Sequence, residues 1–359
     1  CGRKKEQYMS TFSCDYAENL AVTERALAYG KSFDVLKKSL AVGDGEVTFF
    51  YIVGFVKDGE LQRVMQFLLG KESLGNARDT EKIIPYVEVS RCGELEAAVT
   101  AILSGQTALF ADTFGSEIIL LVLRTYPVRS IAEPESDRVM QGARDGFVET
   151  LIMNTALLRR RIRDPRLTLR HFDIGGSSHT DVVVCYMDGV ARSEYVDAVC
   201  EKIRTARPKS LTLGAQSLAE SLIKRRWYNP FPKIRTTERP DTAAAQVLEG
   251  NVLVFCDTSP EVMILPTSIF DFAEEADDYA FPPLTGSYLR ILRLIILLLS
   301  VVATPLWYLA LEYSEALPES LRFLVPDEPG ALPIIVQLFL AELALDGLKL
   351  ASMNTPDML

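Results

Sequence analysis

The sequence predicts an α/β protein with two similar α/β subdomains, produced by an internal duplication and followed by membrane helices. The first observation is a ten-residue stretch, SGQTALFADT at 104–113, which returns in nearly the same form as EGNVLVFCDT at 249–258. The second is a longer pair in the same order, TFFYIVGFVKDGELQRV at 48–64 and VVCYMDGVARSEYVDAV at 183–199. The third is a run without charged residues at 294–311.

Each repeat predicts a β-α unit, a variable middle and an α-β-β unit. In the longer pair, an apolar strand leads through Gly54 or Gly189 to apolar residues at helical spacing. In the shorter pair, an alanine-rich helix ends at Gly105 or Gly250, where a left-handed cap favours glycine, and a buried strand follows. Strands that are apolar on both faces are typical of a sheet covered by helices. A further apolar strand follows at 117–123 and 261–265.

We therefore expect two subdomains, at 30–135 and 168–270, that superpose with Gly105 over Gly250 and Asp112 over Asp257. Composition and apolar patterning assign the rest of the chain. The remaining parts are an N-terminal segment (1–29), a helical connector (136–167), a linker (271–287), a transmembrane helix (288–313) and a second membrane or interfacial helix (332–353).

Composition limits the class of partner. A net charge of −10 and an isoelectric point near 5.0 argue against nucleic acid, because binding to phosphates needs a basic surface. The six cysteines are far apart and form no CxxC pair, and the chain has two histidines. This pattern favours a reducing compartment and predicts neither a metal site nor a cofactor. The start at Cys1, without a preceding apolar segment, favours a fragmentary N-terminus over a lipoprotein.

No motif in the chain predicts catalysis. GARDGF at 142–147 lacks the lysine and hydroxyl of a phosphate-binding loop, and GGSSH at 175–179 has no nucleophile elbow. Asp112 and Asp257 end equivalent strands and are each followed by threonine. Such a pair would suit acid-base chemistry or an ion site, but turns at the strand ends explain it better. We expect a protein that is not an enzyme.

The uncharged run at 294–311 is long enough to span most of a bilayer, about 27 Å at 1.5 Å per residue. Arg290 and Arg293 precede it, and Trp307 and Tyr308 lie towards its other end, as interfacial anchors do. A buried helix of a soluble protein is the alternative.

Three ionisable residues interrupt the second apolar run. Glu342 and Asp346 are spaced i, i+4 and share a helix face, and Lys349 lies within reach of Asp346. Ionisable groups on a membrane helix usually face a bundle interior, a cavity or a partner, which favours an ion pathway. The alternative is an interfacial amphipathic helix, because the apolar run is short for a span.

Several long motifs, in order, resemble the GerA family of spore germination proteins. They include GARDGF with RRRIRDPRL, YMDGVA, FPKIRTTERPDTAAAQVLEGNVLVFCDTSPEVMILP and LTGSYLRILRLI, and the resemblance covers roughly residues 30–359. It implies an inner-spore-membrane protein, related to the A subunits of germinant receptors, with its soluble region facing the spore core or cytoplasm. It also implies membrane lipid, a homo-oligomer and other receptor-type subunits as partners, and a chain cut short at its C-terminus.

Two functions follow as hypotheses. The first is a membrane subunit of a germination receptor or channel complex, whose soluble region serves assembly and gating of ion release. The second is a small-molecule sensor that binds in the soluble α/β region and signals through the membrane helix. A polar cleft between the subdomains would favour the second hypothesis, and a flat complementary flank would favour the first.

A basic cluster at a helix C-terminus is the candidate contact of the soluble region. Four arginines compose it, and cations suit this end of the helix dipole. A solvated or intrachain-paired helix end and a contact with lipid phosphates remain open, but the resemblance favours a contact with another subunit or subdomain. The cluster consists of Arg159, Arg160, Arg161 and Arg163.

Overall fold

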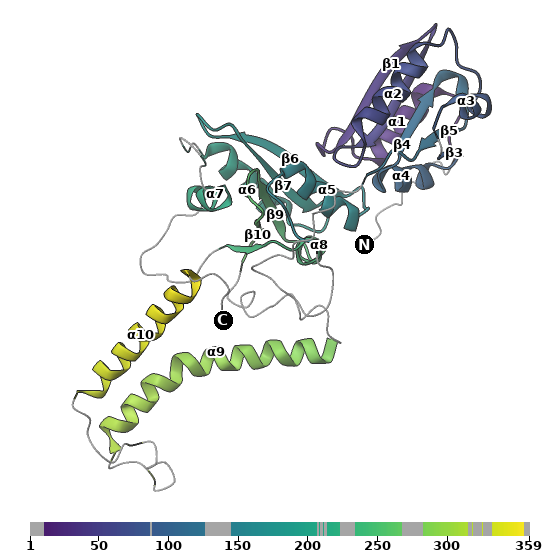
Figure 1. The fold of residues 1–359 in the computed structure, drawn as a ribbon. Coiled ribbons are helices and arrows are strands. Elements are labelled where there is room, and N and C mark those ends of the chain that lie inside the picture. Colours follow the sequence, from purple (N-terminus) through teal and green to yellow (C-terminus); the bar gives the residue numbers. More distant parts are fainter. Residues whose placement is uncertain are drawn as a thin grey trace. The chain divides into compact units, whose positions relative to one another are not determined.

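The computed structural model divides the chain into two compact units, Cys1–Ala280 and Phe281–Leu359. Figure 1 shows the helices and strands of both units. The predicted linker at 271–287 lies mostly outside the residues that the structure describes. Those residues are 11–86, 88–125, 145–206, 208, 211, 214–222, 234–267, 283–314, 318, 325 and 332–354.

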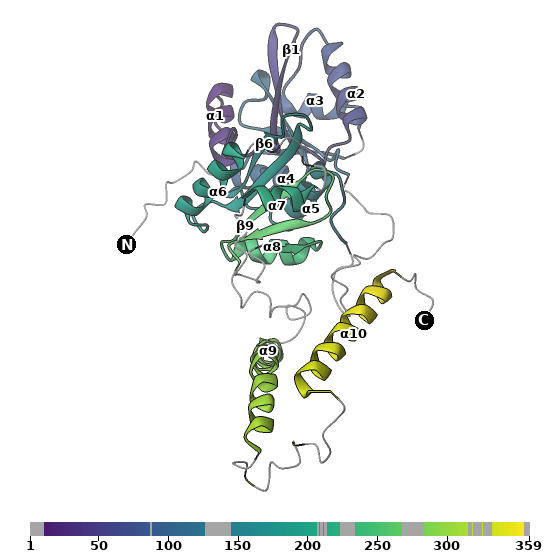
Figure 2. The same cartoon turned by 90° about the vertical axis from the view of Figure 1, so that its left-hand side faces the viewer.

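The first half of the larger unit is a five-stranded sheet in the order β1-β2-β4-β5-β3, with all neighbouring strands antiparallel. Helices cover both of its faces, and Figure 2 shows α1 and α2 on opposite sides of β1. Its elements are α1 (Tyr16–Ala26), β1 (Val35–Val42), β2 (Gly45–Ile52), α2 (Asp58–Leu69), α3 (Ala77–Ile83), β3 (Val89–Cys92), α4 (Leu95–Leu103), β4 (Thr107–Ala111), a short 3-10 turn (Asp112–Phe114) and β5 (Ile118–Leu121).

The second half repeats this architecture, with strand order β6-β7-β9-β10-β8 and antiparallel pairing throughout. Apolar side chains of α5 and α8 pack on one face of its sheet, and those of α6 and α7 pack on the other. Its elements are α5 (Leu151–Arg161), β6 (Leu167–Ile174), β7 (Thr180–Met187), α6 (Ser193–Thr205), α7 (Ala215–Leu222), β8 (Arg235–Thr237), α8 (Pro240–Leu248), β9 (Val252–Cys256) and β10 (Val262–Leu265).

The internal duplication is confirmed at the level of individual strand pairs. In the first sheet Val47 pairs with Ala111, and in the second Val182 pairs with Cys256. Asp112 and Asp257 therefore follow equivalent strands. Gly105 and Gly250 follow equivalent helices at φ values of 93° and 101°, a left-handed conformation that costs glycine little.

The duplication also includes the helix that precedes each sheet. Asn19 of α1 accepts a hydrogen bond from the Ser13 amide and donates one to the Ser13 carbonyl, and Asn154 of α5 makes the same two bonds with Val148. The sequence pattern predicts a helical connector at 136–167, the range that contains α5. In the structure α5 holds in the second half the position of α1 in the first.

Among its described residues, the smaller unit has two helices, α9 (Pro283–Glu312) and α10 (Ile334–Asn354). Within the described residues, one helix, Leu284–Glu312, has the length and apolar composition needed to cross a membrane, and none of its most apolar stretch is buried inside the structure. This helix corresponds to the predicted transmembrane helix at 288–313.

Candidate functional site

The two halves of the larger unit are joined by α5, which contributes to two cores at once. Leu157 and Leu158 pack into the core beneath the second sheet, whereas Ala156 packs into the core of the first half. The backbone turn at Gly54 approaches α5 closely. A Cβ built there would lie 3.1 Å from the Cβ of Ala156 and 3.1 Å from Cγ2 of Ile152. Glycine at this turn therefore permits the contact between the halves.

A buried ion pair crosses the same junction. The Arg159 side chain at the end of α5 donates from Nε to Oδ2 of Asp34 at 2.8 Å and from Nη2 to Oδ1 at 3.2 Å. The side chains are 1% and 2% exposed. The guanidinium also donates to the backbone carbonyls of Asp164 (3.0 Å) and Leu167 (2.9 Å), so its donors are used on both sides of the junction. Two-point pairing of this kind fixes distance and orientation together.

The chain just before β1 extends the junction along β6, which is an edge strand. The Phe33 amide donates to the Leu169 carbonyl at 3.1 Å, and the Leu169 amide donates to the Ser32 hydroxyl at 3.1 Å. The Ser32 hydroxyl in turn donates to Asp34. The segment at 32–34 thus connects the ion pair to the outer edge of the second sheet.

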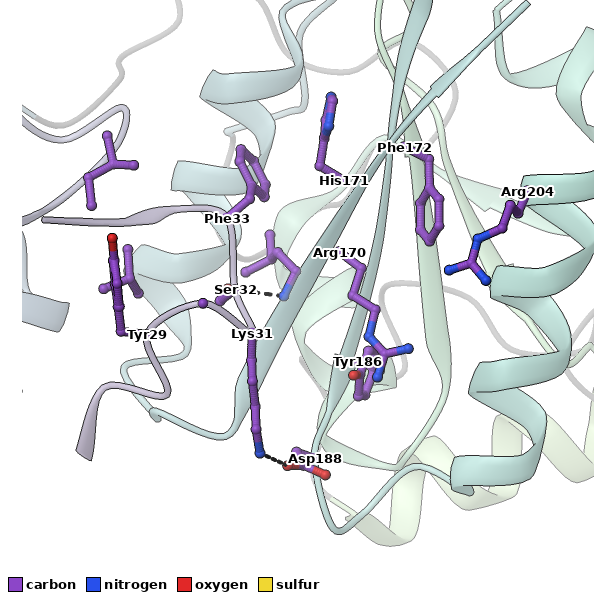
Figure 3. A pocket seen from close by; sticks show the side chains of 14 residues that line it. Tyr29, Lys31, Ser32, Phe33, Arg170, His171, Phe172, Tyr186, Asp188 and Arg204 are labelled. Atoms are coloured by element: carbon purple, nitrogen blue, oxygen red, sulfur yellow. Dashed lines mark hydrogen bonds and ion pairs between the residues drawn. The ribbon is translucent and has the colours of Figure 1, made fainter. Parts of the chain in front are cut away.

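A groove of about 850 Å³ lies beside this junction, between the start of β1 and the outer edge of β6 (Figure 3). Its surface is partly aromatic and partly charged, with three cations, Lys31, Arg170 and Arg204, and one acid, Asp188. The lining residues are 29–33, Val35, Leu36, 169–172, Tyr186, Asp188 and Arg204.

Several of the groove side chains contact one another. Lys31 and Asp188 face each other at 3.8 Å, and the Arg170 guanidinium lies 5.2 Å from the Tyr186 ring centre (Figure 3). Arg170 also pairs with Asp197 at 3.3 Å. Burial raises the pKa of the Tyr186 hydroxyl although the Arg170 charge opposes the shift, so this hydroxyl remains a hydrogen-bond donor at neutral pH. The groove can therefore offer cations and a phenol donor to an anionic group.

The four arginines of the predicted basic cluster have different surroundings. Arg159 is in the buried junction, whereas Arg160 and Arg163 are exposed. Arg161 pairs with Asp145 at 2.6 Å. Burial alone would raise the pKa of Asp145, but the hydrogen bond and charge of Arg161 hold it below its usual value. That pair contributes stability above about pH 4, and the contribution is lost as pH falls through the lowered pKa.

Asp112 and Asp257 have different environments despite their equivalent positions. Asp112 is exposed, whereas Asp257 accepts a hydrogen bond at 3.0 Å from the Leu151 amide at the start of α5. A carboxylate there satisfies a free amide and suits the positive end of the helix dipole. The role that the structure gives Asp257 is to cap α5.

The cysteines and histidines of the described part do not gather into a metal site. Among those residues, no group of three or more histidine, cysteine, aspartate or glutamate side chains is placed so that it could hold a metal ion. Burial raises the pKa of Cys185, and it raises that of Cys256 to about 12, which keeps both thiols protonated. His171 and His179 each contact an aspartate on the surface, Asp181 and Asp173.

The proposed ion-pathway residues lie on α10. The side chains of Glu342, Asp346 and Lys349 are exposed in the smaller unit. Their spacing along the helix places Glu342 and Asp346 on one face, as the sequence predicted.

Sequence patterns do not reveal two features of the larger unit. The first is the role of Asp34, because its partner lies 125 residues away and a single acid before a strand has no distinctive pattern. The second is a phenylalanine seven residues before an asparagine, in Phe12–Asn19 and again in Phe147–Asn154. Phe12 and Phe147 make matching edge-on contacts with Phe110 and Phe255. This shared spacing would have revealed the equivalence of α1 and α5.

Residues 25–359 match the family described as Bacillus/Clostridium GerA spore germination protein. Stage V sporulation protein AF of Bacillus subtilis (strain 168) is 35% identical over 348 residues, which cover 95% of this chain and 70% of that protein. Spore germination protein GerQA of Bacillus cereus is 25% identical over 335 residues, which cover 91% of this chain and 66% of that protein. The chain thus spans about two thirds of the length of these relatives. The resemblance inferred from the motifs is confirmed.

A solved structure has the same fold. The N-terminal domain of the A subunit of the Bacillus megaterium spore germinant receptor GerK3 matches with a TM-score of 0.52 at 24% identity. The match covers 72% of this chain and 98% of that chain. It confirms the predicted fold class of two similar α/β subdomains.

Arg159→Ala is expected to lower the free energy of unfolding of residues 1–280 by about 3–5 kcal/mol, because it leaves the buried Asp34 carboxylate without its partner. Arg163→Ala is the matched control and should change that free energy by less than about 0.5 kcal/mol, because its side chain is exposed. Urea unfolding followed by circular dichroism measures both. Equal effects of the two substitutions would contradict a structural role for the pair.

Proposed function

We propose, from the premise that the chain belongs to the Bacillus/Clostridium GerA spore germination protein family, that it is a membrane-anchored subunit of a germination receptor or channel complex. Its soluble region would serve assembly and the gating of ion release. The observation that carries the proposal is the combination of a 29-residue apolar helix with a soluble unit whose two halves are locked together by Arg159 and Asp34. Because the two halves are held together by a buried pair, a displacement of one half would move the other with it.

The proposed partners follow from the same features. The apolar surface of α9 requires membrane lipid or other membrane helices around it. The family relationship supports further copies of this chain and other receptor-type subunits as neighbours. We propose no enzymatic activity, because the relatives bear the names of sporulation and germination proteins and no described cluster of side chains suggests catalysis.

For its location, we propose the inner spore membrane, with residues 1–285 on the side of the cytoplasm or spore core. Arg290 and Arg293 lie at the start of α9 and Glu312 at its end, which suits the excess of basic residues on the cytoplasmic side. The buried thiols of Cys185 and Cys256 suit a reducing compartment.

In sealed vesicles or intact membranes, a maleimide that cannot cross the membrane is expected to leave Cys14 unlabelled, because the soluble unit would be on the inner side. Cys14 is exposed in the structure, so it should react fully once the membrane is opened with detergent. The control is the yield in detergent, measured by mass spectrometry. Full labelling of Cys14 before the membrane is opened would overturn the assigned orientation.

We propose that Glu342, Asp346 and Lys349 line part of an ion pathway. Their helix, α10, runs for 21 residues and is otherwise mostly apolar. Moving an ionised carboxylate to the centre of a membrane helix costs about 2.5–3.5 kcal/mol, so such a group is expected to face water or a partner. An amphipathic helix lying in the membrane interface would satisfy these groups as well, and conductance distinguishes the two arrangements.

Glu342→Gln in the full-length protein is expected to change cation selectivity or block ion release while assembly is retained, because the substitution keeps the shape and removes the charge. Gln337→Glu serves as a control for added charge on another turn of α10. Conductance in planar bilayers measures the effect. Unchanged conductance and selectivity in both Glu342→Gln and Asp346→Asn would support the interfacial arrangement instead.

A second candidate function is a small-molecule sensor, and the groove between the two halves favours it. The groove is large enough for a small organic molecule, and three cations face one acid on its surface. A short carboxylic acid would suit Arg170 and Lys31, with its carbon chain against Phe33 or Phe172. Binding there would act on the segment at 32–34 that holds the halves together.

Succinate is the probe for this candidate. If the groove is a sensor site, succinate should raise the melting temperature of residues 1–280, and Arg170→Ala should remove most of that rise, because the groove loses its best carboxylate partner. Arg163→Ala is the control for loss of a cation elsewhere. A rise that is equal in both variants would indicate non-specific ion binding and remove the support for a sensor.

A further inference from the structure

The face of α5 that meets the first half of the unit has a counterpart on α1. The two helices have the same length, and each residue of α1 corresponds to the residue 135 positions later in α5. The junction residues of α5 are Ile152, Ala156 and Arg159. Their counterparts on α1 are Ala17, Ala21 and Glu24. Ala156 and Arg159 are each 1% exposed, whereas Ile152 is 45% exposed, so the comparison depends on the first two. Ala17 and Ala21 are exposed, and the Glu24 side chain is 34% exposed. On α1 the equivalent face is thus uncovered.

The surface that receives α5 also occurs twice. In the first half it contains Gly54 and three side chains that are almost completely buried, Asp34, Phe55 and Leu103. Strand registers and helix ranges give the equivalent residues in the second half. Gly54 corresponds to Gly189 and Asp34 to Arg166. Phe55 corresponds to Val190 and Leu103 to Leu248.

In the second half this surface is open. Val190 is 43% exposed, Leu248 is 55% exposed and the Arg166 side chain is 61% exposed. A Cβ built at Gly189 would meet no heavy atom within 4 Å, whereas at Gly54 it meets α5. The second half therefore presents the receiving surface, and the first half presents the matching helix face.

The residues of the two uncovered surfaces that correspond to the buried ion pair have opposite charges, in the reverse sense to the junction inside the chain. Within the chain, the helix supplies the cation, Arg159, and the receiving surface supplies the acid, Asp34. In the uncovered pair, the helix supplies the acid, Glu24, and the receiving surface supplies the cation, Arg166. Glu24 already contacts Lys37 at 2.8 Å and Arg166 contacts Asp164 at 2.6 Å. If Glu24 met Arg166, the charges along the row Lys37, Glu24, Arg166 and Asp164 would alternate between positive and negative.

We propose that a second copy of this chain docks here, with α1 of one copy packed on the Gly189–Val190 turn and Arg166 of the next. Glu24 of the first copy pairs with Arg166 of the second, as Arg159 pairs with Asp34 inside each chain. Since the two surfaces lie on different halves of one chain, the contact is head-to-tail and can repeat from copy to copy. This inference rests on the assembly role proposed above and identifies the surface that serves it.

The reversal of charge explains why α1 and α5 do not take each other's places on the two receiving surfaces. If α1 occupied the place of α5, Glu24 would face Asp34, and if α5 occupied the place of α1, Arg159 would face Arg166. Like charges brought together at an interface are strongly unfavourable, so each helix face is directed to its own receiving surface. A partner of unrelated sequence would not need this correspondence, which favours a second copy as the occupant.

Cysteine cross-linking of the full-length protein in its membrane tests the proposal. In a background with Cys1, Cys14 and Cys92 changed to serine, Ala21→Cys is combined with Gly189→Cys and the membranes are oxidised. The expected product is a reducible ladder of dimers and larger species on a denaturing gel. Ser39→Cys with Thr48→Cys is the positive control, because the two hydroxyls lie 2.7 Å apart on the paired strands β1 and β2, and this pair should give a reducible monomer without a ladder.

Three further variants separate a specific contact from chance collisions. Ala21→Cys with Gly59→Cys is the negative control, since Gly59 is exposed at the start of α2, and it should give no ladder. Adding Glu24→Arg to the test pair should lower the ladder yield about tenfold, because two arginines would meet, and adding Arg166→Glu as well should restore it.

The outcomes distinguish this inference from the proposed function. If the positive control forms its bond but the Ala21→Cys and Gly189→Cys pair gives no ladder, the proposed interface is wrong, whatever the conductance shows. A ladder that survives Glu24→Arg unchanged would also overturn it. A specific ladder in a protein that releases no ions would instead support the interface and count against the channel role.

Discussion

The bidentate ion pair between Arg159 and Asp34 is the contact on which the arrangement of the larger unit depends. It joins the end of α5 to the strand entrance of the first half, and both side chains are almost completely removed from water. In such surroundings an ion pair contributes geometry more than stability, since the cost of removing two charges from water offsets much of their attraction. Loss of either partner leaves a buried charge, and the surrounding contacts, including the Phe33 bond to the edge of β6 and the close approach at Gly54, depend on the same alignment.

The two halves have the same strand order, and differences in sequence between them decide which surfaces are internal. The helix preceding the second sheet, α5, is covered on two sides, whereas α1 is covered on one. The receiving turn holds Phe55 in the first half and Val190 in the second, with 0% and 43% exposure. A repeated unit that joins to its neighbour necessarily leaves one uncovered surface of each kind at its two ends, as in other repeat architectures. In this chain the corresponding residues on those two surfaces, Glu24 and Arg166, have opposite charge.

Much of the fold could be predicted because the repeated motifs coincide with structural requirements. Gly105 and Gly250 mark helix ends that need a left-handed residue, and the apolar runs at β4 and β9 mark central strands. The direction of the strands could not be inferred from apolar character, because helices cover both faces of an antiparallel sheet here as they do in parallel sheets. The role of α5 was missed for a related reason. Its apolar side chains are divided between two cores, so the helix shows no single apolar face, and its polar residues resemble those of a connector.

The sequence by itself determined the duplication, the two α/β halves, the apolar helix and the family, because each is written in local patterns of residue type and spacing. Only the tertiary structure decided which members of the arginine cluster are buried and what they contact. Arg159, Arg161 and Arg163 are neighbours on the chain with the same side chain, yet one crosses the junction, one pairs with Asp145 and one is exposed. Helical geometry points consecutive residues in different directions, and burial depends on elements far away in the sequence. A partner such as Asp34 acquires its role when the halves are packed together.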